Sequence, residues 1–214
     1  MKYCHLLILS LLFATIAKGQ AKYSVHAGIG YHSSNQIAKV IFYENPPTLS
    51  PRMGFTIGGQ INLPLSKRII YQSGLFYQGK ATHYRITPTA DYGLNRSLRI
   101  HYLSLNQNAL YRFWGNKQRG LYAGAGLYGA IAMGGKFNDE VITIMGPTNM
   151  GGSMKFEAGT NAYYRMFDAG GNLLLMGQHK KWQATLKLSH SVAPYIKPEK
   201  IRFTSLFFML GYEL

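Results

Sequence analysis

The clearest pattern in the sequence is an alternation of apolar and polar residues across positions 163–190. Two alternating runs flank a short polar turn at 177–181, which predicts a β-hairpin. The second run places Trp182, Ala184, Leu186 and Leu188 on one face and Gln183, Thr185, Lys187 and Ser189 on the other. Each predicted strand therefore has an apolar side, which must contact either a protein core or lipid.

The same alternation recurs along most of the chain. It predicts eight strands, at about 22–32, 52–63, 69–77, 100–113, 121–133, 163–176, 182–190 and 201–214. The stretch from Gly79 to Arg99 is polar and irregular, so we expect a loop there. A Gly- and Met-rich stretch at 134–162 predicts a long connection that is extended in its last part.

The connections alternate between short and long. Short ones fall at 64–68, 114–120 and 177–181, and long ones centre near positions 42, 89, 148 and 196. Transmembrane β-barrels have this arrangement, with short periplasmic turns and long extracellular loops. We therefore predict an all-β fold, an eight-stranded antiparallel up-and-down transmembrane β-barrel, in a single domain over 20–214.

The composition of the two faces indicates which one meets lipid. The polar face is rich in glycine and small amides, which suit the crowded interior of a small barrel. The apolar face carries aromatics near the short turns, which predict a membrane-interface girdle: Tyr23, Tyr71, Tyr111, Phe113, Trp182 and Tyr212. The alternative is a soluble β-protein with its apolar faces turned inward.

The charge of the chain points to an anionic partner. The 214 residues carry a formal charge of +15, with 14% aromatic and 14% charged residues. Lysines and arginines are scattered, with no basic run or predicted recognition helix, so we expect no nucleic-acid binding. Outer-membrane lipid and lipopolysaccharide are the expected partners, and other envelope or secretion proteins are possible ones.

The N-terminus predicts export. Lys2 precedes an apolar core at 6–17, and Ala17 and Gly19 are small residues at a predicted cleavage site before Gln20. We expect a signal peptide over 1–19, which is too short to anchor the chain in a membrane. The only cysteine, Cys4, lies within it, so the mature protein has no disulfide. We predict location in the outer membrane with both termini periplasmic.

Several short blocks resemble a known family. The last strand, 203–214, ends the chain with an apolar row, as bacterial outer-membrane proteins do, with Leu214 where phenylalanine is usual. The blocks YQSGLFY (71–77), YLSL (102–105), LYAGAGLY (121–128), MFDAG (166–170) and LGY (210–212) resemble the PorT-type outer-membrane β-barrel proteins of Bacteroidetes-like bacteria. Asn106 departs from the proline often found there. The resemblance implies an outer-membrane barrel, and a role in type IX secretion for some members only.

Two charged residues stand out on the predicted interior face. Asp168 would be costly inside a barrel without a partner. We expect an ion pair with Lys187, treated as a diagonal neighbour on the next strand. The alternative is that Asp168 hydrogen-bonds to tyrosine or asparagine side chains. Both readings make Asp168 structural.

The sequence predicts no catalytic site. Ser189 and His190 are adjacent in a strand, so their side chains point to opposite faces and cannot pair. No metal-ligand cluster or nucleotide-binding motif is present, and we expect no cofactor. The leading prediction is a non-enzymatic barrel that acts through its long extracellular loops. The alternatives are a component of a secretion or envelope-assembly machine and a lipid A-modifying enzyme.

Overall fold

The computed structural model describes residues 21–35, 48–89, 92–116, 118–157, 164–194 and 202–214. The predicted signal peptide lies outside the described residues. The strands are β1 (Lys22–Asn35), β2 (Thr48–Pro64), β3 (Ile69–Thr89), β4 (Tyr92–Gly115), β5 (Arg119–Thr143), β6 (Gly146–Ser153), β7 (Phe156–Glu157), β8 (Tyr164–Arg165), β9 (Phe167–His179), β10 (Trp182–Ser191) and β11 (Arg202–Glu213). No helix in these ranges has the length and apolar character needed to cross a membrane.

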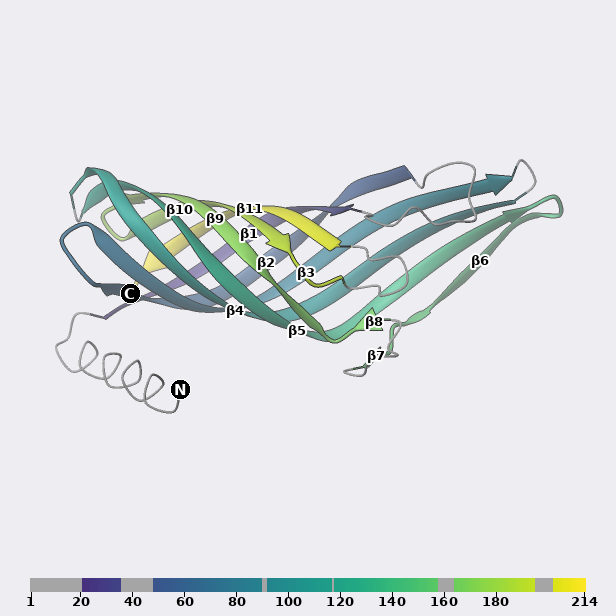
Figure 1. Ribbon diagram of the computed structural model, residues 1–214, viewed down its shortest axis with the longest axis horizontal. Coiled ribbons are helices and arrows are strands. Elements are labelled where there is room, and N and C mark those ends of the chain that lie inside the picture. The colour runs from purple at the N-terminus through teal and green to yellow at the C-terminus, as the bar shows by residue number, and fades with distance from the viewer. Residues whose placement is uncertain (1–20, 36–47, 90–91, 117, 158–163, 195–201) are drawn as a thin grey trace.

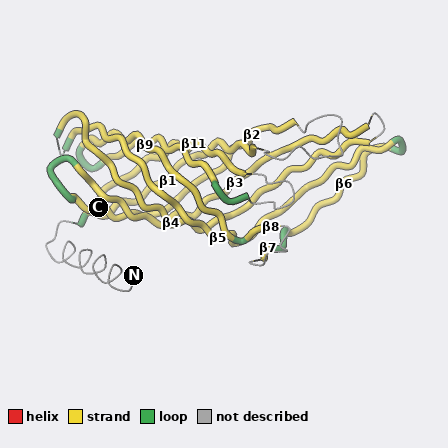
Figure 2. The backbone as a smooth tube through the Cα atoms, viewed as in Figure 1, coloured by secondary structure: helices red, strands yellow, loops and turns green. Residues whose placement is uncertain are grey.

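Eight strands close into a barrel (Figures 1 and 2). The ring runs β1–β2–β3–β4–β5–β9–β10–β11 and returns to β1, and β6 pairs with β5 outside it. All neighbours in the ring are antiparallel. Closure pairs the backbone groups of every ring strand and leaves no open edge within the ring. This confirms the predicted eight-stranded up-and-down barrel.

The three short turns are confirmed and lie at one end of the barrel. In the hairpin of β9 and β10, for example, Trp182 pairs with His179. The C-terminus lies at this same end, to the left in Figure 1. Lys180, in the turn, has a φ of 55°, a left-handed conformation that tight hairpin turns require.

The apolar faces point outward around the whole ring. Leu127 on β5 is 71% exposed and Leu173 on β9 is 60% exposed, whereas their neighbours Tyr128 and Asn172 are buried. Polar, aromatic and charged side chains fill the interior. A soluble β-core would reverse this arrangement, so the outer surface is suited to lipid.

Several predicted strand ends were wrong, because the structure continues strands far past them. The expected loop at 79–99 is a continuous hairpin of β3 and β4, paired from Gly79 and His101 to Thr89 and Tyr92. The expected connection at 134–162 contains the end of β5 and all of β6. We call residues 48–52, 79–89, 92–101, 134–143 and 146–153 the distal sheet, which extends to the right in Figure 1.

A hydrophobic cluster holds the distal sheet to the barrel. Its buried members come from β4, β5, β11 and the segment after β6: Leu98, Ile100, Tyr102, Tyr128, Ala130, Ala132, Met154 and Phe203. Phe156 and Tyr164, from the small parallel pair of β7 and β8, pack against them. Met154 donates a 2.9 Å backbone hydrogen bond to Gly135. The distal sheet is thus a packed part of the fold.

Candidate functional site

A buried carboxylate organises the interior of the barrel. Asp168, near the start of β9, receives a 2.8 Å ion pair from the Nζ atom of Lys80 on β3. The hydroxyl groups of Tyr128 and Ser191 also donate to this carboxylate, Tyr128 at 3.3 Å. The Lys80 ammonium lies 5.0 Å from the ring centroid of Tyr102. The two buried charges are therefore compensated by each other, by two hydroxyl groups and by an aromatic ring.

The expected ion pair between Asp168 and Lys187 was wrong. Lys187 pairs in register with Leu174, six residues along β9 from Asp168. Six residues of strand span about 20 Å, too far for a side-chain contact. Both residues are buried inside the barrel, but Lys187 reaches the amide oxygen of Asn106 at 3.5 Å instead.

Amide side chains continue the polar network below this pair. Asn172 donates to Asn106 at 3.1 Å and to Asn108 at 3.3 Å, and accepts a 2.7 Å hydrogen bond from Ser189. The Lys187 ammonium lies 4.7 Å from the ring centroid of Phe207. Together these groups fill the interior, as expected for a barrel of eight strands. The filled interior favours a rigid barrel over a water-filled channel.

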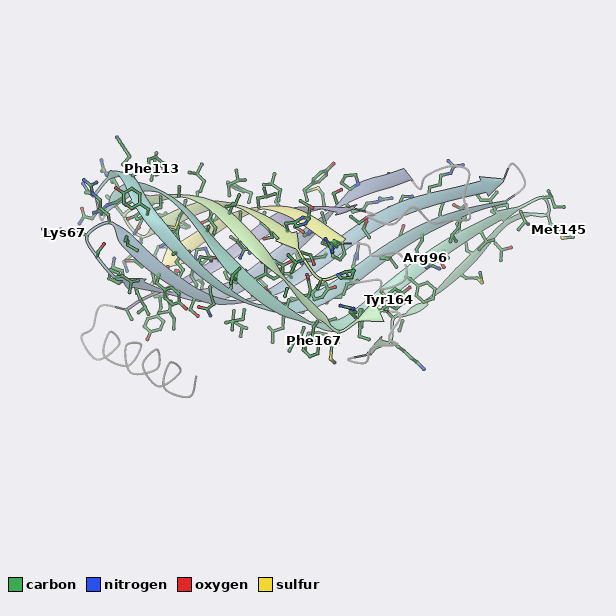
Figure 3. All side chains as sticks on the ribbon, viewed as in Figure 1. Lys67, Arg96, Phe113, Met145, Tyr164 and Phe167 are labelled. Atoms are coloured by element: carbon green, nitrogen blue, oxygen red, sulfur yellow. The ribbon has the colours of Figure 1, made fainter. Side chains whose placement is uncertain are left out.

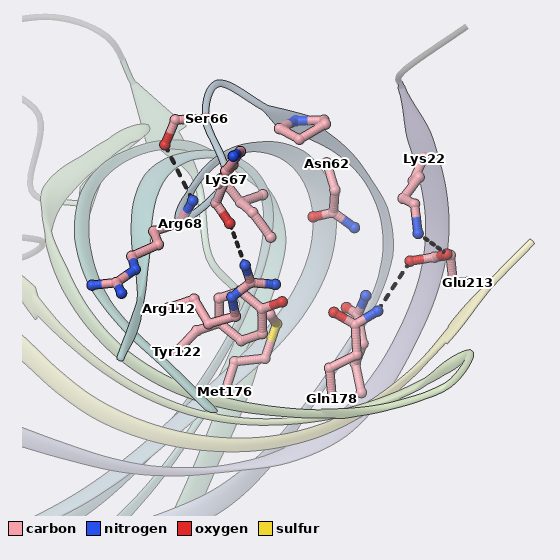
Figure 4. Close-up of a pocket in the computed structure, with 13 residues that line it drawn as sticks. Lys22, Asn62, Ser66, Lys67, Arg68, Arg112, Tyr122, Met176, Gln178 and Glu213 are labelled. Atoms are coloured by element: carbon pink, nitrogen blue, oxygen red, sulfur yellow. Dashed lines mark hydrogen bonds and ion pairs between the residues drawn. The ribbon is translucent and has the colours of Figure 1, made fainter. Parts of the chain in front are cut away.

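The short-turn end of the barrel holds a small basic pocket (Figure 4). Its volume is about 80 Å³, space for only a few waters. Lys22 forms a 2.6 Å ion pair with Glu213, and Arg112 donates to the backbone carbonyl of Lys67. Tyr122 and Met176 line its inner side and are almost fully buried. The pocket is therefore closed inward by packed side chains.

The six aromatics expected at the membrane interface lie near the short turns. Five of them are exposed on the outside, from 37% for Tyr212 to 60% for Trp182. Figure 3 shows Phe113 and Lys67 at this end of the molecule, far from Met145 at the tip of the distal sheet. The sixth, Tyr71, is half-buried because its hydroxyl donates to the side chain of Gln107.

Gln107 interrupts the apolar outer face, and the structure gives the reason. It sits directly opposite Ser73 on β3 and donates a 2.9 Å hydrogen bond to the Ser73 hydroxyl. With Tyr71 donating to its oxygen, the amide has partners for both of its ends. A polar side chain facing lipid is tolerable when its hydrogen bonds are made within the protein.

The distal sheet carries polar pairs that sequence reasoning missed. Arg96 binds Asp139 through two hydrogen bonds of 2.7 and 2.5 Å, and Asn95 donates to Glu140 at 2.8 Å. His83 Nδ1 lies 2.9 Å from the Ser97 hydroxyl. The cross-strand register aligns each pair. The missed signal was the period-two row of Leu94, Leu98 and Ile100, which Arg96 interrupts.

These contacts bear on the possibility of a hydrolase. Ser189 is buried in the interior, while His190 is exposed outside and contacts Thr204 at 3.0 Å. A serine nucleophile also needs a histidine held by a third group. The His83–Ser97 pair has the right separation, but the nearby Glu140 carboxylate is hydrogen-bonded to Asn95. Within the described part of the chain, no group of three histidines, cysteines or acids is arranged to hold a metal ion.

Comparison with known proteins gives a family and a set of similar structures. A family model described as outer membrane protein beta-barrel domain matches residues 17–197. No curated protein sequence matches the chain. Among solved structures, the chain is similar to Ail, the attachment invasion locus protein of Yersinia pestis, with 11% identity and a TM-score of 0.44 over 91% of this chain and 99% of that one.

Two further structures show similar levels of likeness. The Neisserial surface protein A (NspA) has 10% identity and a TM-score of 0.41 over 91% of this chain and 99% of that one. OprG from Pseudomonas aeruginosa has 9% identity and a TM-score of 0.40 over 91% of this chain and 96% of that one. Identities this low carry no information on function. The family match spans most of the chain and agrees with the closed ring and its apolar exterior, and the chain therefore belongs to the outer-membrane proteins that share this β-barrel domain.

Proposed function

We propose that the protein is a non-enzymatic interaction protein of the outer membrane that holds the distal sheet outside the cell. The observation that carries this proposal is the length of β4 and β5, which have 24 and 25 residues. A strand crosses the bilayer in about 9–11 residues. Each strand therefore continues well beyond the membrane while it remains paired with its neighbour.

The proposed orientation places the short turns and both termini in the periplasm. Short periplasmic turns and longer extracellular elements are the usual arrangement in bacterial barrels. A signal peptide over 1–19 would deliver the chain to that side of the membrane. The aromatics near the short turns, such as Trp182 and Tyr212, would then lie at the periplasmic interface.

The absence of catalysis is part of the proposal. Two buried charged residues of the interior, Lys80 and Asp168, form an ion pair with each other. In the half-buried His83–Ser97 pair the nearby carboxylate of Glu140 is hydrogen-bonded to Asn95 and not to the histidine. A lipid A-modifying role would require such a group, so we place the function in binding and not in chemistry.

The orientation can be tested by labelling single cysteines in intact cells. The predicted mature chain lacks cysteine, so Met145→Cys and Lys181→Cys each supply one label site at opposite ends of the molecule. Met145 is 95% exposed at the tip. A membrane-impermeant maleimide should label Met145→Cys in intact cells and Lys181→Cys only after lysis. The reverse pattern would refute the proposal.

A second candidate is docking of a partner protein, including a component of a secretion or envelope-assembly machine as the PorT-type resemblance implies. Ile144 and Met145 at the tip of the distal sheet are 80% and 95% exposed. Apolar side chains this exposed, far from lipid, favour protein contact. A photoreactive residue at position 145 should then crosslink a discrete protein in cells, whereas one at Lys181 should not.

A further inference from the structure

Three basic side chains surround one hollow at the base of the distal sheet. The hollow has a volume of about 310 Å³ and is walled by Arg52 on β2, Arg99 on β4 and Lys136 on β5. Ser97 and Asn138 also line it and offer polar groups beside the charges. The size and the mixture of cationic and polar groups suit a phosphorylated sugar.

The strand register puts Arg99 and Lys136 on the outer surface of the sheet. Arg99 pairs directly with Lys136 on one side and with Ala81 on the other. Lys80 points into the interior, so its neighbour Ala81 and the two cations point outward. Because Ala81 is short, the space between the longer basic side chains stays open.

None of the three cations has an acidic partner in the described part of the chain. The ion pairs found there are Lys22–Glu213, Lys80–Asp168 and Arg96–Asp139. Like charges grouped at one place repel one another, and a bound anion would remove that repulsion. Arg96, three residues from Arg99, faces the other side of the strand, where Asp139 neutralises it. The uncompensated positive charge therefore lies on the outer side.

The hollow lies at the depth of the lipid head groups. Tyr111 and His101 mark the two ends of the outward-facing band on β4, ten residues apart. Ten residues at about 3.3 Å each, tilted by about 40°, span roughly 25 Å, the usual height of the apolar band. Arg99 is the next outward residue beyond His101 and so lies just above the lipid tails.

An aromatic cluster forms the boundary directly below the hollow. The rings of Tyr77 and His101 stack with centroids 5.7 Å apart and planes 6° apart. Phe55 lies 5.8 Å from Tyr77 and covers the Cα of Gly79. Amphipathic rings of this kind favour the membrane–water interface. The acyl chains of a lipid would therefore contact the aromatic cluster, and its anionic head group would contact the cations of the hollow.

We propose that this hollow binds a phosphate on the glycolipid head group of the outer leaflet, the phosphorylated lipid A portion of lipopolysaccharide. Arg52 and Arg99 supply the planar guanidinium groups that pair with phosphate oxygens, and Lys136 supplies a point charge. Ser97 and Asn138 face the attached sugar. This inference rests on the proposed orientation, which puts the distal sheet beside that leaflet.

The test measures binding of fluorescent bisphosphorylated lipid A to the folded mature protein in detergent micelles. Arg99→Ala/Lys136→Ala should weaken binding at least about tenfold, because two charge-assisted contacts are lost. The matched control, Arg119→Ala/Lys181→Ala, removes two cations at the opposite end and should change affinity less than about twofold. Equal losses in both double variants would overturn the proposal.

A second variant keeps the test decisive if the first one fails to fold, as judged by a heat-shift gel. Asn138→Asp retains all three cations, changes no volume and puts a carboxylate at the exposed rim of the hollow. It should also weaken binding of lipid A several-fold by repulsion. Unchanged binding in Asn138→Asp would count against the site.

Three further probes identify the source of the phosphate. Dephosphorylated lipid A should bind the wild type far more weakly than the phosphorylated form. Equally tight binding of inorganic phosphate, or tighter binding of a polyglutamate peptide, would overturn the lipid assignment. If Met145→Cys is labelled in intact cells but substitutions in the hollow leave lipid A binding unchanged, only this inference fails. If labelling of Met145→Cys requires lysis, the proposed function itself fails.

Discussion

Lys80 and Asp168 meet across the interior of the barrel, with the ammonium nitrogen 2.8 Å from a carboxylate oxygen. Their side chains are 1% and 2% exposed, so water screens neither charge. They belong to β3 and β9, which are not neighbours in the ring. The pair therefore connects two distant walls, and each charge depends on the other for compensation.

Lys80→Met should strongly destabilise the barrel. Methionine has a similar volume but leaves the carboxylate of Asp168 buried without a cation. Breaking a buried pair in this way costs about 3–5 kcal/mol. Urea unfolding in lipid vesicles, followed by the folded band on a heat-shift gel, measures the loss.

The double variant Lys80→Met/Asp168→Asn separates charge from packing. Asparagine still accepts hydrogen bonds from Tyr128 and Ser191 but carries no charge. Most of the stability lost in Lys80→Met should therefore return. A double variant as unstable as the single one would show that the lysine acts by packing alone.

Lys187→Met should behave in the opposite way. Lys187 is buried without a carboxylate, and its polar contact is a 3.5 Å approach to the amide oxygen of Asn106. Replacing it by an apolar side chain of similar size removes the cost of a buried ammonium group. We expect unfolding free energy within about 1 kcal/mol of wild type or higher. A loss comparable to that of Lys80→Met would contradict this.

The sequence predicts the barrel well where one strand face meets lipid. There an apolar residue must appear at every second position, so Val25, Leu105 and Leu173 could be assigned correctly from alternation alone. In the distal sheet both faces of a strand can be polar. Around Arg96 and Ser97 the inward row Leu94, Leu98 and Ile100 is interrupted by Arg96, so the stretch is hard to recognise as a strand although it is fully paired.

The polar stretch that was expected to be a loop also explains why the partner predicted for Asp168 was wrong. Lys80 continues the inward series of Gln78 on β3, but it falls in the stretch expected to be a loop. Its contact with β9 crosses the interior between strands that are distant in the ring, and no local spacing encodes such a contact. The predicted Asp168–Lys187 pair could in addition have been rejected from the register of the turn, which places Lys187 opposite Leu174.

Trp182→Ala should destabilise the barrel more in a bilayer than in detergent. The indole packs edge-on against Tyr212, with ring centroids 5.1 Å apart, and is 60% exposed to the surroundings. Loss of the ring pair and of the interfacial indole should cost about 1–2 kcal/mol in vesicles. Trp182→Phe should lose less, because a ring still faces Tyr212. Equal effects in both environments would argue against a membrane-interface role.

The distal sheet should loosen as pH falls, because of His83. Burial, followed by the charge of Arg52, lowers the pKa of His83 below its usual value of 6.5, and Glu140 only partly opposes them. The folded state therefore favours the neutral ring, which contacts the Ser97 hydroxyl at 2.9 Å. The contribution of His83 to stability is present above pH 6.5 and is lost as pH falls below it. Limited proteolysis of the distal sheet should be faster at pH 5 than at pH 7.5, and His83→Gln should remove most of this difference. An unchanged pH response in that variant would assign the effect to other groups.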